Sequence, residues 1–338
     1  MKWKGVELCC PACRGALRET GDHEPELRCD ACDRNFPIIL GIPDLRIFSD
    51  PYINMDADRA KARKVAERYE DLDLRGLVEY YYSMTSVVTR RQAAAFTHGL
   101  LAGPARAEDA LRSWEGAVPT TPSGCMLEIG CGTAPLLVAA RPRYRTVVGA
   151  DIAFRWLAVA KKRLAEAGAD VPLLCACAEA LPLRDATFDR VIGDSVIENV
   201  QDPERSLAEA HRVLRPGGRL FLSTSNRFSL GPDPQTGVWA AGYLPRRVLE
   251  ARVRRQGGIP PKRRLLSGSG LSRLIRRAGF ARGALSLPTF SAEQLAHFPL
   301  GIRRLVDAYH VAARLPVSRH LLFVFGPKLY ATAKKTNA

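Results

Sequence analysis

The chain has 338 residues, of which 46% are hydrophobic, and it carries a formal net charge of +15. That length can hold one large domain and a smaller one, with enough apolar residues to fill a core. No run approaches the roughly 20 apolar residues of a membrane-spanning helix, and the opening MKWKGVELCC lacks the pattern of a signal peptide. We therefore expect a cytoplasmic protein with no transmembrane segment. Nine cysteines fit reducing surroundings, because their spacing suits metal binding better than disulfides.

Four cysteines near the N-terminus form two C-x2-C pairs: Cys10 and Cys13 in CPAC, and Cys29 and Cys32 in CDAC. Zinc prefers four soft ligands in a tetrahedron, and two tight turns at this separation can supply them. The alternative is four ordinary buried cysteines. Four thiolates leave no open coordination position, so we expect structural zinc. A module of residues 1–48 buries too little surface to fold without such a crosslink.

The residues around the cysteines extend this pattern. LCCPACRGALR and LRCDACDRNFPIILGIPDLR resemble the small zinc-ribbon proteins that bind and activate several tRNA, rRNA and protein methyltransferases. The resemblance covers residues 5–47. Similar modules also occur fused ahead of rRNA guanine methyltransferases.

Residues 49–118 have the pattern of a helical cap. Apolar residues recur at three-to-four spacing in DADRAKARKVAERYEDL and in SVVTRRQAAAFTHGLL. We expect Pro104, Pro119 and Pro122 to mark the exit from these helices. Three adjacent tyrosines, Tyr80 to Tyr82, lie between the two runs and cannot share one helix face. One of them could point toward a ligand, although packing between helices is the more ordinary explanation.

Strand and helix patterns alternate from Cys125 onward. Strands are expected at CMLEIG, TVVGADI, VPLLCACA, FDRVIGDS and RLFLSTSN, with helices between them and LRPGG as the turn into the fifth strand. HLLFVFGPKLYATAKK is expected to supply a last antiparallel strand, and residues 288–318 an amphipathic helix. The sequence thus predicts an α/β fold for residues 119–338: a doubly wound, mostly parallel, seven-stranded sheet with an insertion at 228–267.

LEIGCGTAP lies at the turn from the first strand of this sheet to its first helix. Glycines at such a turn allow a sharp backbone and the close approach of a ligand. The motif is shorter than the dinucleotide fingerprint, and the carboxylate of Glu128 would repel a pyrophosphate but attract a cation. The alternative is that this motif forms a turn that binds another nucleotide. The motif resembles the E/D-x-G-x-G-x-G loop of class I S-adenosylmethionine-dependent methyltransferases, with Ala134 in place of the last glycine.

The resemblance extends over residues 125–226 and implies a cofactor site. It places S-adenosylmethionine, which carries a sulfonium and an ammonium, against Glu128, Gly130, Gly132 and Ala134. Asp151 would accept the ribose hydroxyls, and Ile152 beside it is also placed at the site. The remaining positions that it implies are Cys177, Ala178, Glu179 and Asp194, although Cys177 stands where the family usually has an acid.

We expect Cys13→Ser or Cys29→Ser to release zinc and unfold the N-terminal module while the core still binds this cofactor.

The catalytic base is not identified by any motif. An acceptor hydroxyl or amine must lose a proton, and the family often has a histidine where this chain has Asn199, whose amide cannot take one. The candidates for this base are Glu198, Tyr81 and His98.

A basic segment covers residues 212–282, where 16 lysines and arginines face two acids. It could attract RNA, anionic lipid or only solvent. The first hypothesis is a methyltransferase acting at oxygen or nitrogen of a small molecule, such as a glycosylated or lipid-linked biosynthetic intermediate. The second is a methyltransferase of rRNA or tRNA bases, and the third a non-catalytic protein that activates a partner. The sequence leaves the oligomeric state open.

Overall fold

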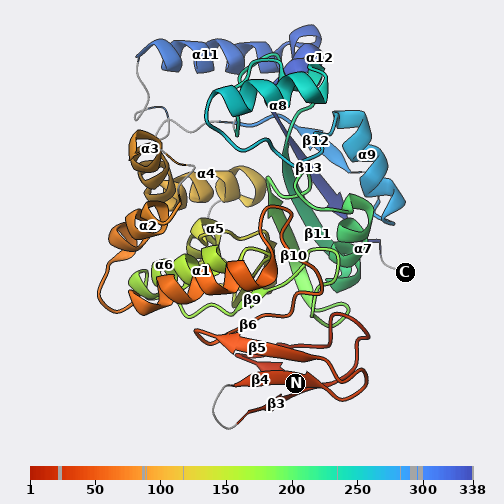
Figure 1. The fold of residues 1–338 in the computed structure, drawn as a ribbon. Helices are drawn as coiled ribbons and strands as arrows, with labels where there is room; N and C mark the ends of the chain where they lie inside the picture. Colours follow the sequence, from red (N-terminus) through yellow and green to blue (C-terminus); the bar gives the residue numbers. More distant parts are fainter. Residues whose placement is uncertain are drawn as a thin grey trace.

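The computed structural model describes residues 1–21, 25–85, 88, 90–116, 118–233, 235–281, 283–289, 295 and 300–336. Figure 1 shows an α/β core with a small β-rich module at one end and three helices, α8, α11 and α12, at the other.

A seven-stranded sheet forms the core, with strand order β12-β13-β11-β10-β7-β8-β9. Its strands are β7 (Cys125–Ile129), β8 (Thr146–Asp151), β9 (Leu173–Cys175), β10 (Phe188–Asp194), β11 (Leu214–Ser225), β12 (Ala284–Ser286) and β13 (Lys328–Lys334). The five strands from β9 to β11 pair in parallel, and β13 runs antiparallel to both β11 and β12. The predicted fold class is therefore confirmed.

Helices cover both faces of the sheet (Figure 1). They are α5 (Pro135–Ala140) and α6 (Phe154–Glu166) on one face, and α7 (Pro203–Val213) and α9 (Gly268–Arg277) on the other. Neighbouring strand residues point to opposite faces: Leu127 packs in the cluster with Leu207 of α7, and Met126 in the cluster with Leu137 of α5. Apolar residues on both faces bury the parallel strands. Because these strands run in the same direction, their carboxyl ends lie together at one edge of the sheet.

The N-terminal module continues the core beyond β9. Its strands are β1 (Lys2–Trp3), β2 (Val6–Glu7), β3 (Leu17–Thr20), β4 (Glu26–Cys29), β5 (Asn35–Ile39) and β6 (Ile42–Pro43). Asp44 forms a parallel bridge to Cys175 of β9, and Leu8 an antiparallel bridge to Leu183. Leu27 of this module belongs to the same buried cluster as the strands of the core. The module and the sheet therefore share one hydrophobic core.

Four helices follow the module: α1 (Met55–Glu67), α2 (Leu74–Ser83), α3 (Arg90–Leu101) and α4 (Gly103–Glu115). Side chains of Asn54 and Asp73 accept hydrogen bonds from the first turns of α1 and α2, which fixes where these helices begin. Pro119 and Pro122 follow the end of α4 as expected, but Pro104 lies in its first turn, where proline's missing N–H removes no helix bond.

The insertion between β11 and α9 contains a short 3-10 turn, η1 (Ala241–Tyr243), and α8 (Arg246–Arg255). Between β12 and β13 lie α11 (Leu300–Arg314) and α12 (Pro316–Phe325). The first half of HLLFVFGPKLYATAKK is thus helix rather than strand, and only Lys328–Lys334 pair in the sheet. Parts of the expected 288–318 helix, 290–294 and 296–299, lie outside the described residues, as does Arg282 of the basic segment. Among the helices that the structure describes, none is long and apolar enough to cross a bilayer.

LRPGG differs from its predicted form as a simple turn. It begins β11, where Leu214 pairs with Phe188 before the register shifts and Arg219 pairs with Arg190. Gly217 has a φ of +77°, and a Cβ on Gly218 would lie 2.9 Å from the carbonyl oxygen of Arg215. The glycines therefore make an irregularity inside the strand, which periodicity alone does not reveal.

Candidate functional site

The sulfur atoms of Cys10, Cys13, Cys29 and Cys32 lie within 4.8 Å of one another. Cys10 Sγ is 3.6 Å from Cys32 Sγ, and Cys13 Sγ is 3.4 Å from Cys29 Sγ. A zinc ion about 2.3 Å from each sulfur would need edges of about 3.8 Å, so the four positions fit a tetrahedron.

The two cysteine turns have the same backbone form. Arg14 N donates to Cys10 O at 2.9 Å, and Asp33 N donates to Cys29 O at 3.0 Å. Arg14 and Asp33 follow their first cysteine by four residues, and both have positive φ. Burial raises the pKa of the Cys29 thiol, but backbone N–H groups outweigh it and lower the pKa to about 7. The donor set suits zinc, and the assignment of these ligands stays a prediction.

The loop LEIGCGTAP follows β7 and bends through three residues with positive φ: Gly130 at +71°, Gly132 at +51° and Ala134 at +62°. A Cβ on Gly130 would lie 2.1 Å from Cγ2 of Val196, so only glycine fits there. A Cβ on Gly132 would meet no described atom within 4 Å. The loop is therefore tight on one side and open on the other. Ala134 adopts left-handed backbone although it has a side chain, directly before α5.

Glu128 is buried directly before this loop, and its Oε2 has no hydrogen-bond partner among the described residues. Burial raises the pKa of its carboxyl well above the usual value, and the charges of Asp194 and Asp151 raise it further. An unpartnered buried carboxylate beside two other acids is unfavourable unless a cation joins it. The three acids end or lie near the end of β7, β8 and β10, at the carboxyl edge of the sheet.

A cavity of about 720 Å³ opens at this edge. Six of the ten residues predicted to bind cofactor line it: Gly130, Asp151, Ile152, Ala178, Glu179 and Asp194. The other four, Glu128, Gly132, Ala134 and Cys177, are not on its wall. The Cys177 thiol donates instead to Phe48 O at 3.6 Å, and burial raises its pKa to about 11. The Cys177 side chain is therefore engaged elsewhere, and its neighbours Ala176 and Ala178 form the cavity wall here.

Asp151 organises the loop as well as lining the cavity. Its Oδ2 accepts a hydrogen bond from Gly132 N at 2.8 Å, and its Oδ1 from Ala153 N at 2.7 Å. Each carboxylate oxygen can accept a second bond. Glu179 is tied more firmly, because its Oε1 accepts from the backbone of both Gln201 and Asp202.

Asp194 lies at the end of β10 beside a lysine. Lys328 Nζ is 2.8 Å from Asp194 Oδ1, and the hydroxyls of Ser195 and Ser223 also donate to this oxygen. Burial raises the pKa of Asp194, but Lys328 and these hydrogen bonds outweigh it and hold the pKa below the usual value. Ser195 has a φ of +59°, so the backbone is strained where it enters the cavity wall.

The three candidate bases are not brought together. Tyr81 lines the cavity, and burial raises the pKa of its phenol. Glu198 is buried away from the cavity wall, where it accepts hydrogen bonds from Thr224 Oγ1 at 2.9 Å and Ser225 N at 3.1 Å. His98 is exposed on α3. Glu198 and His98 therefore lack direct contact with the cavity, and the base stays unidentified.

Sequence reasoning missed the aromatic wall of the cavity. Its rings are Phe48, Tyr52, Tyr82, Phe96 and Trp156, in addition to Tyr81. The ring centroids of Tyr81 and Trp156 are 4.2 Å apart. The three consecutive tyrosines were a signal for this wall, but Trp156 looked like one apolar position of an amphipathic helix.

Comparisons with known proteins bear on this site. Residues 127–222 match a family model described as a methyltransferase domain. The core has the methyltransferase fold. The match supports the resemblance of the core to class I methyltransferases, and the resemblance of the N-terminal module stays a prediction.

Curated relatives match parts of the chain. An uncharacterized 37.1 kDa protein in a Streptomyces fradiae transposon is 33% identical over 62% of this chain and 60% of its own length. A demethylmenaquinone methyltransferase of Thermus thermophilus is 42% identical over 35% of this chain and 50% of its own. A ubiquinone biosynthesis O-methyltransferase of Parvibaculum lavamentivorans is 37% identical over 30% and 40%. The chain thus spans 40% to 60% of the length of these relatives.

A solved structure is also similar to part of this chain. Phosphoethanolamine N-methyltransferase 2 of Haemonchus contortus, in complex with S-adenosyl-L-methionine, aligns with 69% of this chain and 52% of its own. The TM-score is 0.45, at 16% sequence identity.

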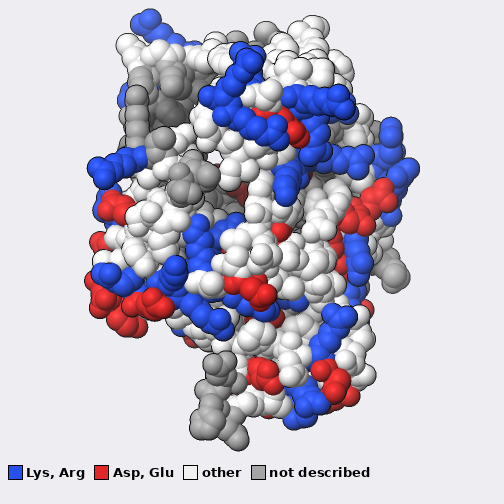
Figure 2. All heavy atoms as spheres, in the orientation of Figure 1, with Lys and Arg blue, Asp and Glu red and all other residues white. Residues whose placement is uncertain are grey.

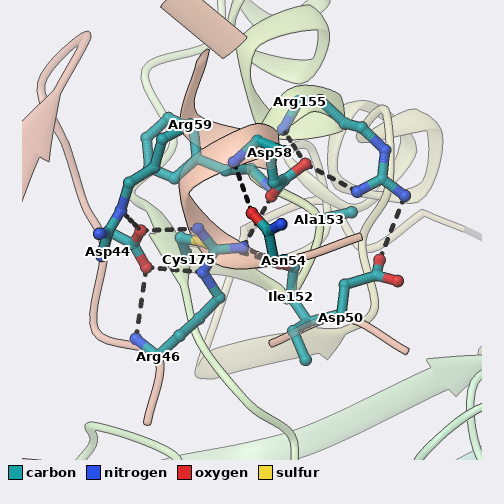
Figure 3. A network of polar contacts seen from close by, with 12 residues as sticks. Asp44, Arg46, Asp50, Asn54, Asp58, Arg59, Ile152, Ala153, Arg155 and Cys175 are labelled. Atoms are coloured by element: carbon teal, nitrogen blue, oxygen red, sulfur yellow. Dashed lines mark hydrogen bonds and ion pairs between the residues drawn. The ribbon is translucent and has the colours of Figure 1, made fainter. Parts of the chain in front are cut away.

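A buried network of ion pairs joins the N-terminal module to the α/β core (Figure 3). Arg46 is fully buried and donates to both oxygens of Asp44 at 2.7 Å. Its Nη1 also donates to Asp58 Oδ2 on α1 at 2.7 Å and to Ile152 O at 2.9 Å. Ile152 directly follows Asp151. Arg46 therefore contacts the module, the helical cap and the loop after β8 with one side chain.

The network continues on the cavity side. Asp58 accepts hydrogen bonds from Phe154 N at 2.8 Å and from Arg155 Nη1 at 2.7 Å, so it caps the start of α6. Arg155 also pairs with Asp50 at 3.1 Å, and both residues line the cavity. Burial disfavours the charged form of Asp44, but Arg46 and Arg59 outweigh it and lower its pKa. The network is thus satisfied internally (Figure 3). Its far end, Arg155 and Asp50, lies on the cavity wall.

These contacts change the expectation for the cysteine substitutions. Because the module and the sheet share a core, we now expect Cys13→Ser both to reduce bound zinc and to weaken S-adenosylmethionine binding. Metal content by atomic absorption and affinity by calorimetry test this on the same sample. Cys125→Ser is the control, since Cys125 lies in β7 outside the cluster. Unchanged affinity in zinc-depleted protein would show that the module and the core are independent.

Proposed function

We propose that the chain transfers the methyl group of S-adenosylmethionine to a small-molecule acceptor. Glu128 carries the proposal, because one of its buried carboxylate oxygens has no partner among the described residues and two further acids act on it. A ligand with an ammonium and a sulfonium would complete this site, whereas the pyrophosphate of a dinucleotide would be repelled.

The residues present fit the cofactor in three places. Glu128 would act on its positive charge from directly behind the wall residues Ile129 and Gly130, and Asp151, on the wall itself, would accept hydrogen bonds from the ribose hydroxyls. The backbone from Cys177 to Glu179 would frame the adenine. When bound, the cofactor supplies both the methyl group and its leaving group, so the chain has mainly to align the acceptor and exclude water.

The acceptor is proposed to be a small molecule methylated at oxygen or nitrogen. A cavity of about 720 Å³ lies within the range of small-molecule sites. The aromatic wall can bury an apolar or lipid-linked acceptor, and Asn199, Gln201 and Gln235 offer polar contacts to a glycosylated one. Two relatives, a ubiquinone biosynthesis O-methyltransferase and a demethylmenaquinone methyltransferase, support a small-molecule acceptor. No residue is assigned as the base.

The RNA alternative rests on the basic segment 212–282. Six of its arginines form ion pairs with acids of the described chain: Arg212, Arg215, Arg246, Arg254, Arg263 and Arg277. A paired arginine has less free charge for a phosphate, so this observation favours the small-molecule acceptor.

A non-catalytic role is disfavoured by Glu128, because an unpartnered buried acid costs stability unless a ligand joins it.

Methyl transfer into a source-cell extract tests the proposal. The zinc-loaded chain is mixed with methyl-labelled S-adenosylmethionine and extract, with and without nuclease. We expect label in a low-mass, organic-extractable fraction that survives nuclease, and mass spectrometry of that fraction would identify the acceptor. Label that vanishes with nuclease would instead establish the RNA alternative.

Asp151→Ala should weaken S-adenosylmethionine binding by about 1–3 kcal/mol, through lost hydrogen bonds to a charged group. The loop also loses the acceptor of its Gly132 and Ala153 amides. Calorimetry measures the affinity, and Asp56→Ala, at a side chain 94% exposed on α1, is the control. Equal affinity of the parent and Asp151→Ala would mean that the ribose lies elsewhere.

A further inference from the structure

Helix α12 presents an apolar stripe to solvent. Val317, Leu321 and Phe325 follow one another at intervals of four residues, so they lie on one face of the helix. Their exposed fractions are 77%, 50% and 39%. On α11, Leu300 and Val311 are 64% and 59% exposed, and eleven residues of helix place them within about 20° of each other. Exposed apolar groups in such a series are unusual on a soluble surface.

Arginines accompany these apolar side chains. Arg304, Arg314 and Arg319 are exposed on α11 and α12, where Asp307 is the one acid of residues 300–325. Helix α8, RRVLEARVRR, has five arginines, of which Arg246 and Arg254 pair with its one acid, Glu250. Figure 2 shows the basic side chains of α8 bordering the mostly uncharged surface of α12, at the end of the molecule away from the N-terminal module.

The insertion and α12 form one continuous surface. Leu230 N donates to Phe325 O at 3.3 Å, and Pro232 forms a bridge with Trp239. Leu230 and Trp239 are 55% and 68% exposed, so they extend the apolar stripe of α12 toward α8. Val253 anchors α8 on Val238 beneath them. We call this region, formed by α8, α11, α12 and the 228–240 loop, the helical end surface.

We propose that the helical end surface docks on an anionic lipid bilayer. Apolar side chains gain by entering the acyl boundary, and arginines gain beside anionic headgroups, about fivefold in affinity for each one near the surface. RNA binds to arginines and to aromatic rings that stack on its bases. The exposed apolar side chains of α11 and α12 named here are mostly aliphatic, so they suit a lipid bilayer better than RNA. A second copy packed through the same patch would bring like-charged arginines together.

The docking surface and the cavity share a segment. Residues 228–267 supply Leu230 and Trp239 to the surface and Gln235 and Ile259 to the cavity wall. Bilayer docking would therefore bring the cavity close to any acceptor held in the lipid. The docking proposal itself stands without the methyltransferase proposal, because binding to vesicles needs no cofactor.

Co-sedimentation of the full, zinc-loaded chain with vesicles tests the proposal. One set of vesicles is phosphatidylcholine alone, and the other also contains phosphatidylglycerol. We expect sedimentation with the anionic vesicles, which weakens with added salt, and little with the neutral ones. Val317→Asp with Leu321→Asp should reduce binding about tenfold or more, because the charges oppose insertion of an apolar face. Arg304→Glu with Arg319→Glu should reduce it similarly.

Two matched controls keep the test specific. Val118→Asp and Arg184→Glu change exposed residues outside the helical end surface, and both variants should bind like the parent. The proposal is overturned if the parent stays in the supernatant at low salt, or if the Val317 and Leu321 variant binds as well as the parent. It is also overturned if labelled RNA binds the parent through the arginines alone, or if the apolar variant merely converts a dimer into a monomer.

Discussion

Arg46→Met should lower the free energy of unfolding by about 3–5 kcal/mol, because removing one partner of a buried ion pair leaves the opposite charges buried without a partner. Arg46 is fully buried, and its loss would leave Asp44 and Asp58 without their main counter-charge in the interior. Chemical denaturation of the zinc-loaded protein, followed by circular dichroism, measures the change. Because Arg46 also holds Ile152 O, we expect weaker S-adenosylmethionine binding in the fraction that remains folded.

Arg18→Met is the matched control for this prediction. Arg18 pairs with Asp30 at 2.8 Å in the same module, but both side chains are about half exposed. Such a surface pair contributes about 1 kcal/mol or less. The parent should also lose stability in acid, because folding lowers the pKa of Asp44. The contribution of Asp44 to the free energy of unfolding is complete above its unfolded pKa of about 3.9. It is lost as the pH falls through the folded pKa. An Arg46→Met variant within 1 kcal/mol of Arg18→Met would refute the role given to this network.

Glu128→Gln should have opposite effects on stability and on binding. The folded protein raises the pKa of Glu128, so ionisation destabilises the ligand-free state as pH rises through that folded pKa. Glutamine removes the charge, and we expect a higher Tm at neutral pH together with at least about a tenfold loss of S-adenosylmethionine affinity, the scale of one lost charge-assisted hydrogen bond.

Thermal melts at mildly acidic and at neutral pH check the stability half of this prediction. The parent should gain stability on acidification relative to Glu128→Gln, because acid protonates Glu128 in the parent alone. Calorimetry checks the binding half. Glu19→Gln, at a side chain exposed in β3, is the control and should change neither quantity. A lower Tm for Glu128→Gln would mean that the carboxylate has a stabilising partner in the absence of ligand.

The sequence predicted the fold because its signals were local. Apolar strands alternating with amphipathic helices specify a doubly wound sheet, and LEIGCGTAP marks the turn where its ligand belongs. The paired cysteines likewise predicted a cluster that the structure brings within 4.8 Å. Their role as zinc ligands, and the domain bounds at 48 and 118, stay predictions.

The remaining features depend on contacts between distant residues. Arg46, Asp58 and Arg155 are separated by 12 and 97 residues, and each resembles an ordinary surface charge in its own segment. Glu198 sits in the loop after β10, where the family pattern suggested a catalytic group, yet the end of β11 binds both of its oxygens. Helix α12 was expected to be strand because its apolar run is short enough for either structure.

The most direct test of the account is a calorimetric titration of S-adenosylmethionine into the zinc-loaded chain, with Glu128→Gln and Asp151→Ala in parallel. We predict saturable binding at one site per chain for the parent, and weaker binding for both variants. No binding heat at millimolar ligand, from protein that circular dichroism shows to be folded, would contradict the cofactor site and the methyl transfer proposed from it.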